Sequence, residues 1–181
     1  MNATLFNDVY PEYQVQLQQN FSRGGVTGSG MGRTLLHKYL NLGLLLPAQL
    51  LLEKGMDPNA KDGYGYTSLH CVICYRRYSE SAEETIINTL LEKGAGVNET
   101  TPGGTTVLML ACQYAKPATV QLLVDRGAEV GLQNTDGETA WDYASDHENA
   151  KPIKQILRRA GAKEGGNFPW LNRGRKRVGR A

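Results

Sequence analysis

Three cysteines are the side chains of this sequence best suited to covalent chemistry. Cys71 and Cys74 form a C-x-x-C pair, the spacing of redox-active thiols that sit at a turn between a strand and a helix. Here the pair follows the residues TSLH within a stretch that predicts a helix, so we expect both thiols to pack rather than react. Cys112 lies at nearly the equivalent place further along the chain. An odd number of cysteines disfavours a disulfide framework and fits a reducing, cytoplasmic compartment.

Neither a metal site nor a nucleotide site is favoured by the pattern of polar residues. The three histidines, His37, His70 and His147, are not grouped with further ligands, as zinc coordination requires. The stretch TGSGMGRT at 27–34 is a near miss for a phosphate-binding loop, because Thr27 replaces its first glycine and Arg33 its lysine. No serine, histidine and aspartate trio or close carboxylate pair stands out. We therefore expect no enzyme activity, no cofactor and no metal.

Positive charge is concentrated near the C-terminal end of the sequence. The formal net charge is +2, yet residues 163–181 hold six Lys or Arg against one Glu, which leaves residues 1–162 slightly acidic. Such a tail can bind nucleic acid or another anionic surface by neutralising phosphate, can direct nuclear import, or can stay solvated. The sequence leaves these alternatives open. The charges concerned are Arg173, Arg175, Lys176, Arg177 and Arg180.

The rest of the composition is that of one ordinary folded unit. With 181 residues, 40% of them apolar and 21% charged, the chain is long enough for a single domain or a short array with a buried core. The first residues lack the charge and the apolar run of a secretory signal, so we expect no export. Polar residues interrupt the most apolar window, at 35–52, so we expect no membrane span. Residues 11–21 predict a short helix, with a strand as the alternative, before a glycine-rich connector at 22–32.

One local pattern returns four times along the chain. It reads GRTLLH at 32–37, GYTSLH at 65–70, GTTVLM at 104–109 and GETAWD at 137–142. The threonines are 33 residues apart in the first and last intervals and 39 apart in the middle one, which indicates a six-residue insertion in the second unit. We assign this insertion to the turn between the two helices of that unit. The first three units end on a Leu-Leu pair followed by a glycine, at positions 55, 94 and 127.

Each unit predicts a helix, a turn, a second helix and an extended finger loop. The threonine can cap the first helix by accepting a hydrogen bond from a free backbone N–H. The glycines suit the left-handed residue on which a second helix ends. Apolar residues such as Leu36, Leu40, Leu51 and Leu52 recur at spacings that put them on one helix face. No single unit can bury that face alone, so the units are stable only when they stack.

This pattern resembles the ankyrin repeat, whose unit carries T-P-L-H near its start and Gly-Ala after its second helix. The resemblance covers residues 32–162 and implies an all-α solenoid of helix-turn-helix repeats with short β-hairpin-like fingers. It divides the chain into an N-terminal segment at 1–31, repeats at 32–64, 65–103, 104–136 and 137–162, and a tail at 163–181. In the family the motif histidine bonds neighbouring loops. His37 and His70 match it, whereas Met109 and Asp142 replace it.

The same resemblance implies that the chain works by binding another protein through a concave surface of fingers and first helices. We expect a stand-alone, monomeric adaptor or inhibitor, with immunity and effector proteins as forms of this function. Tyrosine and arginine often anchor interfaces, so the cluster around the second unit is the predicted hot spot, with ordinary surface tyrosines as the alternative. The predicted contact residues are Tyr64, Tyr66, Tyr75, Arg76, Arg77, Tyr78, Thr105, Tyr114, Lys116, Asp136 and Glu138.

Overall fold

The computed structural model describes residues 32–114, 116–144 and 149–163. The predictions made for residues 1–31, for His147 and for the charges of the basic tail lie outside this part of the chain. The four copies of the repeated pattern all lie inside it, so the proposed array can be compared with the structure directly.

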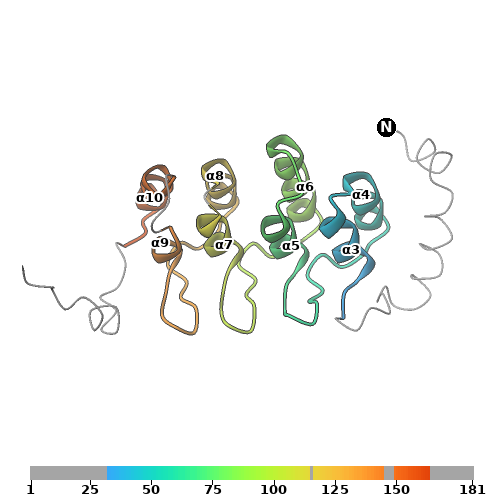
Figure 1. The fold of residues 1–181 in the computed structure, drawn as a ribbon, viewed down its shortest axis with the longest axis horizontal. Helices are drawn as coiled ribbons and strands as arrows, with labels where there is room; N and C mark the ends of the chain where they lie inside the picture. Colours follow the sequence, from blue (N-terminus) through green and yellow to red (C-terminus); the bar gives the residue numbers. More distant parts are fainter. Residues whose placement is uncertain (1–31, 115, 145–148, 164–181) are drawn as a thin grey trace, which may run out of the picture.

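Helices follow one another in pairs that stack in a row (Figure 1). The first helices of the pairs, α3, α5, α7 and α9, form one layer, and the second helices, α4, α6, α8 and α10, form the other (Figure 1). The loops between pairs project as fingers from the first layer (Figure 1). The bounds are Leu35–Leu42 for α3, Leu45–Glu53 for α4, Ser68–Tyr75 for α5, Glu80–Glu92 for α6, Val107–Gln113 for α7, Pro117–Asp125 for α8, Ala140–Tyr143 for α9 and Ala150–Arg159 for α10.

The expected all-α repeat fold is confirmed. One isolated antiparallel bridge joins Thr100 and Thr106, at the base of a finger. Among the described residues no helix is long and apolar enough to cross a membrane, including the two that contain the apolar window at 35–52. Many apolar side chains of that window are instead buried in the core, although Leu42 and Leu46 are exposed.

Threonines begin the first helix of every pair, as the sequence predicts. Thr34, Thr67, Thr106 and Thr139 are the N-cap residues of α3, α5, α7 and α9, and each has an extended backbone. In every case the threonine side chain and the side chain three residues later satisfy backbone N–H groups reciprocally. Such caps supply partners to the free N–H groups of a first turn and are worth about 1 kcal/mol each.

Glycines end the second helices, also as predicted. Gly55, Gly94 and Gly127 have φ angles of 84°, 88° and 89°, in the left-handed region that other residues adopt only with strain. After α4, for example, the N–H of Gly55 donates to the Leu52 carbonyl and the N–H of Met56 to the Leu51 carbonyl. These two C-terminal capping hydrogen bonds end the helix and turn the chain toward the finger.

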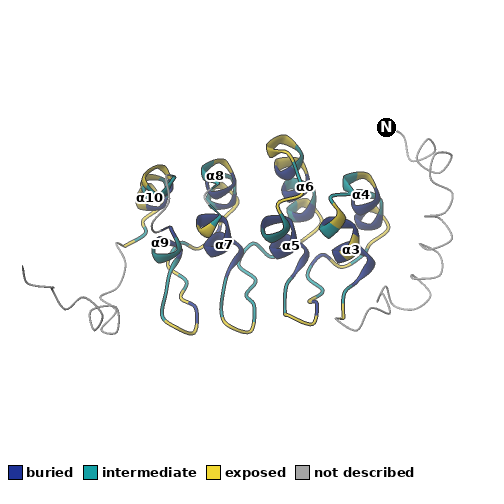
Figure 2. Cartoon of the chain, in the orientation of Figure 1, coloured by how far each residue is buried: buried dark blue, intermediate teal, exposed yellow. Residues whose placement is uncertain are grey.

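A single apolar core runs through the whole stack between the two helix layers (Figure 2). Leu36, Leu40 and Leu51 are completely buried, and Leu52 is almost so, which confirms the predicted shared face. Each helix pair contacts the next, because α3 packs on α5, α5 on α7, and α7 on α9. Burial of one pair therefore depends on its neighbours, the energetic property of a repeat array.

The insertion of the second unit lies mainly in a helix rather than in the turn to which the sequence assigned it. Helix α6 has 13 residues, whereas α4 and α8 have 9 each. The turn itself, at 76–79, is only slightly longer than its counterparts. The helical form is favoured because Ser79 caps α6 through the N–H of Ala82, and because Glu80 and Glu83 lie in the first turn, where the helix dipole stabilises negative charge.

A buried ion pair fixes α6 against the start of α8. The side chain of Glu83 is almost completely buried and forms an ion pair with Lys116, while the Thr119 hydroxyl donates to its second carboxylate oxygen at 2.8 Å. A buried carboxylate is tolerated only when its oxygens are paired in this way. The pair thus couples the longer helix of the second unit to the third unit.

Replacing Glu83 should reveal this coupling. We expect Glu83→Ala to lower the free energy of unfolding by about 3 kcal/mol, because it leaves Lys116 and Thr119 without their shared acceptor. Glu84→Ala, at an exposed position of the same helix, is the matched control and should change stability by less than about 0.5 kcal/mol. Urea unfolding of both variants is the measurement, and equal effects of the two substitutions would contradict the assignment.

Candidate functional site

The fingers are shaped by polar side chains that bind their own loop. The Asp62 side chain is completely buried, and its Oδ1 accepts hydrogen bonds from the N–H groups of Tyr64 at 2.9 Å and Tyr66 at 3.0 Å. Asn134 does the same in a later finger, accepting from the N–H groups of Asp136 and Glu138 at 2.9 Å each. The backbone of each loop is thereby held in one conformation.

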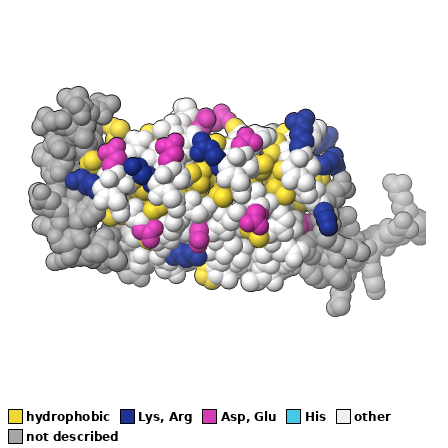
Figure 3. Space-filling view, turned by 180° about the vertical axis from the view of Figure 1, so that it is seen from behind, with side chains coloured by type: hydrophobic (Ala, Val, Ile, Leu, Met, Phe, Trp, Pro, Cys, Tyr) yellow, Lys and Arg dark blue, Asp and Glu magenta, His cyan; other side chains and the backbone are white. Residues whose placement is uncertain are grey.

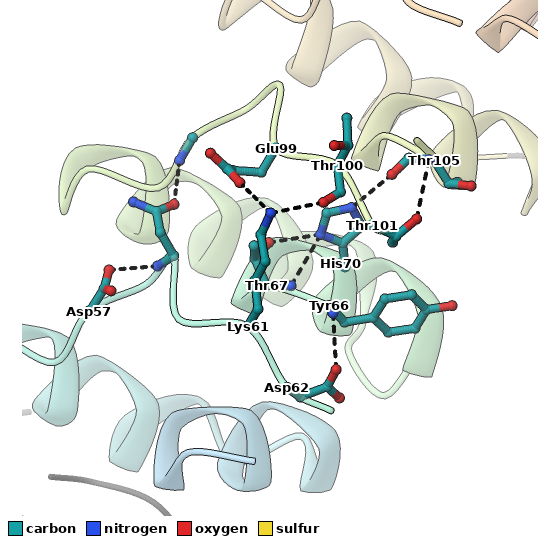
Figure 4. Close-up of polar contacts among 12 residues, drawn as sticks. Asp57, Lys61, Asp62, Tyr66, Thr67, His70, Glu99, Thr100, Thr101 and Thr105 are labelled. Carbon is teal, nitrogen blue, oxygen red and sulfur yellow. Dashed lines mark hydrogen bonds and ion pairs between the residues drawn. The ribbon is translucent and has the colours of Figure 1, made fainter. Parts of the chain in front are cut away.

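Two histidines connect the helix caps to the next finger, and Figure 4 shows the bonds of one of them, His70. Nδ1 of His70 lies 2.8 Å from the Thr67 hydroxyl, and its Nε2 lies 3.2 Å from the Thr105 carbonyl of the following finger. His37 repeats the arrangement one unit earlier, with Nε2 at 3.0 Å from the Tyr66 carbonyl. Each ring thus bonds its own unit on one side and the neighbouring unit on the other.

Burial keeps both imidazoles neutral. It lowers the pKa of His37, and it lowers the pKa of His70 from 6.5 to about 4, outweighing the opposing effect of the hydrogen bond to the Thr105 carbonyl. A neutral ring can accept a hydrogen bond at one nitrogen while it donates from the other, which suits a position between a hydroxyl and a carbonyl. The histidines are therefore structural in this protein.

The third and fourth units keep the cap with different chemistry. Sδ of Met109 accepts a hydrogen bond from the Thr106 N–H at 3.4 Å, and Oδ2 of Asp142 accepts from the Thr139 N–H at 2.9 Å and from its hydroxyl at 2.8 Å. A thioether and a carboxylate have no N–H to donate, so neither can form the histidine bond to a following carbonyl. The departure seen in the sequence thus removes the histidine bond to the next finger but not the cap.

Further bonds join neighbouring fingers directly. Nζ of Lys61 lies 3.0 Å from the Glu99 carboxylate and donates to the Thr100 carbonyl at 3.0 Å (Figure 4). The Thr135 N–H and hydroxyl both donate to the Gly103 carbonyl, at 3.0 and 3.2 Å. With these contacts the row of fingers is a preorganised surface, which reduces the entropy lost on binding.

Three of the predicted contact residues meet beside these fingers, on the first helix layer. Tyr66 stacks on His70, with ring centroids 5.6 Å apart, and the Tyr66 and Tyr114 hydroxyls both lie close enough to the Cys74 thiol to oppose the larger effect of burial on its pKa. Tyr75 follows directly at the end of α5. All four side chains are partly exposed. We call Tyr66, Cys74, Tyr75 and Tyr114 the tyrosine patch.

A buried ion pair supports the edge of the tyrosine patch. Nη2 of Arg33 donates to the Tyr75 hydroxyl at 2.6 Å, and its guanidinium lies 5.7 Å from the centre of the Tyr75 ring. The same side chain pairs with Asp62, its Nε lying 3.5 Å from Oδ2. Asp62 therefore positions both the finger loop and, through Arg33, a tyrosine of the patch.

Arginine lies at the other edge of the patch. Arg76 and Arg77 are both exposed and follow Tyr75 directly. Partial burial raises the pKa of Tyr114, and the positive charge of Arg76 has a smaller, opposing effect. Arg76 therefore belongs to the same surface as the tyrosine patch.

Other predicted contact residues do not join this cluster. Tyr64 is 56% exposed at a finger tip, and the Tyr78 hydroxyl donates to the Leu40 carbonyl at 3.2 Å, which ties the turn before α6 to α3. Lys116 is held by Glu83.

The remaining three predicted residues belong to the later fingers. Thr105 offers its carbonyl to His70, and Glu138 accepts a hydrogen bond from the Asn134 amide at 3.0 Å. Asp136 is exposed in the loop that Asn134 shapes. Thr105 is thereby linked to the tyrosine patch through His70, on which Tyr66 stacks, whereas Asp136 and Glu138 belong to the next finger.

Sequence reasoning missed Asp62 and Arg33 as the groups that position the site. A signal for Asp62 existed: Asp62, Thr101 and Asn134 each accept a hydrogen bond from the backbone N–H four residues later, just before the capping threonine. Polar side chains of this kind commonly shape tight loops. The pairing of Arg33 with Asp62 left no such signal, because the two residues come from different loops.

The thiols fit the packing role expected for them. Burial raises the pKa of Cys71 far above its ordinary value, that of Cys74 to about 11 and that of Cys112 to about 12, so all three stay protonated at neutral pH. Thiols react as thiolates, and burial here suppresses that form. In the described part of the chain, His, Cys, Asp and Glu side chains form no group that could hold a metal ion.

A shallow groove of about 320 Å³ lies on the second layer, between α6 and α8. Its lining includes Glu80, Glu84, Gln121 and Asp125 and is open to solvent. On the face shown in Figure 3, acidic and basic side chains are interspersed along the array, with apolar side chains between them. A surface of mixed sign does not steer charged partners strongly.

Comparison with known proteins identifies the repeat type. A family model for ankyrin repeats in 3 copies matches residues 78–164. Human BCL-6 corepressor-like protein 1 is 34% identical over 121 residues, which cover 66% of this chain and 6% of that protein. Human SH3 and multiple ankyrin repeat domains protein 2 is 28% identical over 137 residues, covering 76% of this chain and 7% of that protein.

A third relative is named as a homolog of a cation channel. The Caenorhabditis elegans homolog of transient receptor potential cation channel subfamily A member 1 is 27% identical over 127 residues, which cover 70% of this chain and 10% of that protein. The chain thus spans between 6% and 10% of the length of these three curated relatives.

The buried histidine makes stability depend on pH. Between pH 6.5 and about 4 the unfolded chain binds a proton at His70 that the folded chain does not, so the free energy of unfolding falls as the pH is lowered through this window. From pH 7.5 to 5.0 we expect His70 to account for a loss of about 2 kcal/mol. His37 acts in the same direction.

Urea unfolding of the wild type and of His70→Asn at these two pH values measures the effect. The variant should have a lower free energy of unfolding than the wild type at pH 7.5. On acidification to pH 5.0, however, its free energy of unfolding should fall by about 2 kcal/mol less than that of the wild type. A parallel loss of stability in the two proteins would show that His70 is not the titrating group.

Proposed function

Because this chain is an ankyrin repeat protein and ankyrin repeats are generally protein–protein interaction modules, we propose that it binds a partner protein through the tyrosine patch and the fingers beside it. It then acts as an adaptor or an inhibitor, including the immunity and effector forms of that function. The ankyrin repeat family is typically non-enzymatic, so binding alone is the proposed activity.

The observation that carries this proposal is the convergence of Tyr66, Tyr75 and Tyr114 around Cys74 on the first helix layer. Tyrosines bury a large area at small entropic cost, since each has only two side-chain torsions. The Tyr75 hydroxyl is already bonded to Arg33 and the Tyr66 ring is stacked on His70, which holds these two rings in place before a partner arrives. A rigid aromatic surface beside rigid fingers is suited to recognising a folded partner or an extended segment of one.

The fingers supply the polar rim of this proposed interface. Lys61 and Glu99 pair with each other in neighbouring fingers, and Asp136 is exposed in a third. Rim charges of this kind set specificity and association rate more than affinity. The three free thiols support a reducing compartment as the place of action.

The basic tail supports a second candidate function, association with nucleic acid or another anionic surface. Its five arginine and lysine residues at 173–180 could neutralise phosphates, and such binding weakens steeply with salt. The two functions make opposite predictions for a chain that lacks residues 164–181. A protein interface on the tyrosine patch survives that truncation, whereas tail-led binding does not.

Affinity capture from native lysate tests the proposed function. The full chain, a form lacking residues 164–181, and the double variant Tyr66→Ala with Tyr114→Ala are used side by side. We expect the truncated form to retain the captured protein and the double variant to bind it about 30-fold more weakly, the loss typical of two anchoring side chains.

A double variant of the groove on the second layer, Glu84→Ala with Gln121→Ala, is the matched control and should bind like the wild type. Circular dichroism and thermal melting establish that each variant is folded. Loss of the partner in the groove control, with retention in the tyrosine double variant, would move the interface to the second helix layer. Loss only on truncation would favour the tail.

A further inference from the structure

Arg76 has an unusual backbone for its residue type. It ends α5 with φ 48° and ψ 39°, and it is the only residue other than glycine with a positive φ in the described part of the chain. For a residue with a Cβ, the left-handed conformation costs about 1 kcal/mol relative to glycine. A residue that is retained under such strain, in place of glycine, often has a function.

The first repeat shows what the fold itself prefers at this position. Gly43 ends α3 with φ 74° and lies at the same distance from its capping threonine, Thr34, as Arg76 does from Thr67. A Cβ on Gly43 would lie 3.1 Å from the Arg77 Cβ and 3.2 Å from the Arg77 carbonyl oxygen. Glycine is thus the residue that suits this helix end, and Arg76 departs from it.

Nothing in the described fold accounts for the Arg76 guanidinium. The side chain is exposed, and none of the ion pairs among the described residues includes it. Arg33, at the other edge of the tyrosine patch, is by contrast neutralised by Asp62. The uncompensated charge beside the patch is therefore positive, and it directly follows Tyr75 in the chain.

We infer that Arg76 is the specificity-determining contact of this surface, binding a carboxylate of an acidic peptide segment whose neighbouring apolar or aromatic side chain packs on the tyrosine patch. This inference rests on the proposed function and names the chemistry of its partner. A guanidinium binds a carboxylate through two parallel N–H···O bonds, which gives orientation as well as affinity. Arginine and tyrosine are among the residues that most often contribute a large share of the binding free energy at protein interfaces.

The backbone strain provides a test that a purely structural arginine would fail. Arg76→Gly removes the guanidinium and at the same time relieves the strain. We expect this variant to melt about 3 °C higher than the wild type and yet to bind acidic peptides at least tenfold more weakly. The matched control is Arg126→Ala, which removes an exposed guanidinium at the end of α8, in the second helix layer, and should change peptide binding by less than threefold.

The probe is a displayed library of random twelve-residue peptides, selected on the full-length chain. We expect the enriched peptides to carry Asp or Glu at a fixed spacing from an apolar or aromatic residue. For one synthetic enriched peptide, replacing its Asp or Glu with the corresponding amide, Asn or Gln, should lower the affinity as much as Arg76→Gly does. The two changes together should cost no more than either alone, because they remove one contact.

The possible results separate this inference from the proposed function. Enriched peptides that lack acidic residues, or that bind Arg76→Gly as well as the wild type, overturn the role of Arg76 while patch binding stands. A melting temperature of Arg76→Gly at or below that of the wild type overturns the strain argument. If every enriched peptide binds the double variant Tyr66→Ala with Tyr114→Ala as tightly as the wild type, both the inference and the proposed site are overturned.

Discussion

Two buried imidazoles set how one repeat sits on the next in this protein. His37 and His70 each bond a capping threonine of their own unit and a carbonyl of the following finger. The bond requires a neutral ring, and burial supplies that condition by lowering the pKa of both residues. Helix start, finger and neighbouring unit therefore depend on the same side chain, and the tyrosine patch lies directly beside these linked units.

The stiffness of the surface follows from these links. Tyr66 provides the carbonyl that His37 binds and the ring that stacks on His70, so its side chain is placed by two successive units. Asp62 holds the loop before it and, through Arg33, the hydroxyl of Tyr75. The side chains that a partner contacts here lost their conformational entropy when the array folded. Little further entropy is therefore lost from them on association.

Much of this architecture could be predicted from the sequence, because it repeats. The threonine caps, the terminal glycines and the buried leucines recur with a period and are read locally. Contacts that occur once could not be predicted in the same way. The Glu83–Lys116 pair and the Arg33–Asp62 pair each join residues far apart in sequence. The length of the insertion did not show that most of it would extend α6, because this depends on where Ser79 caps the helix. Of the tyrosines, only those placed along the first helix layer came together, whereas Tyr78 was used to anchor a turn.

Hydrogen–deuterium exchange of the full-length chain, with and without its captured partner, would locate the binding surface. The partner should slow exchange at the finger residues 62–66 and around residues 74–76 and 113–114, where the tyrosine patch and Arg76 lie. Exchange along the exposed sides of α6 and α8 should stay unchanged. Protection confined to those second-layer helices, or to residues 164–181, would show that the tyrosine patch is not the interface.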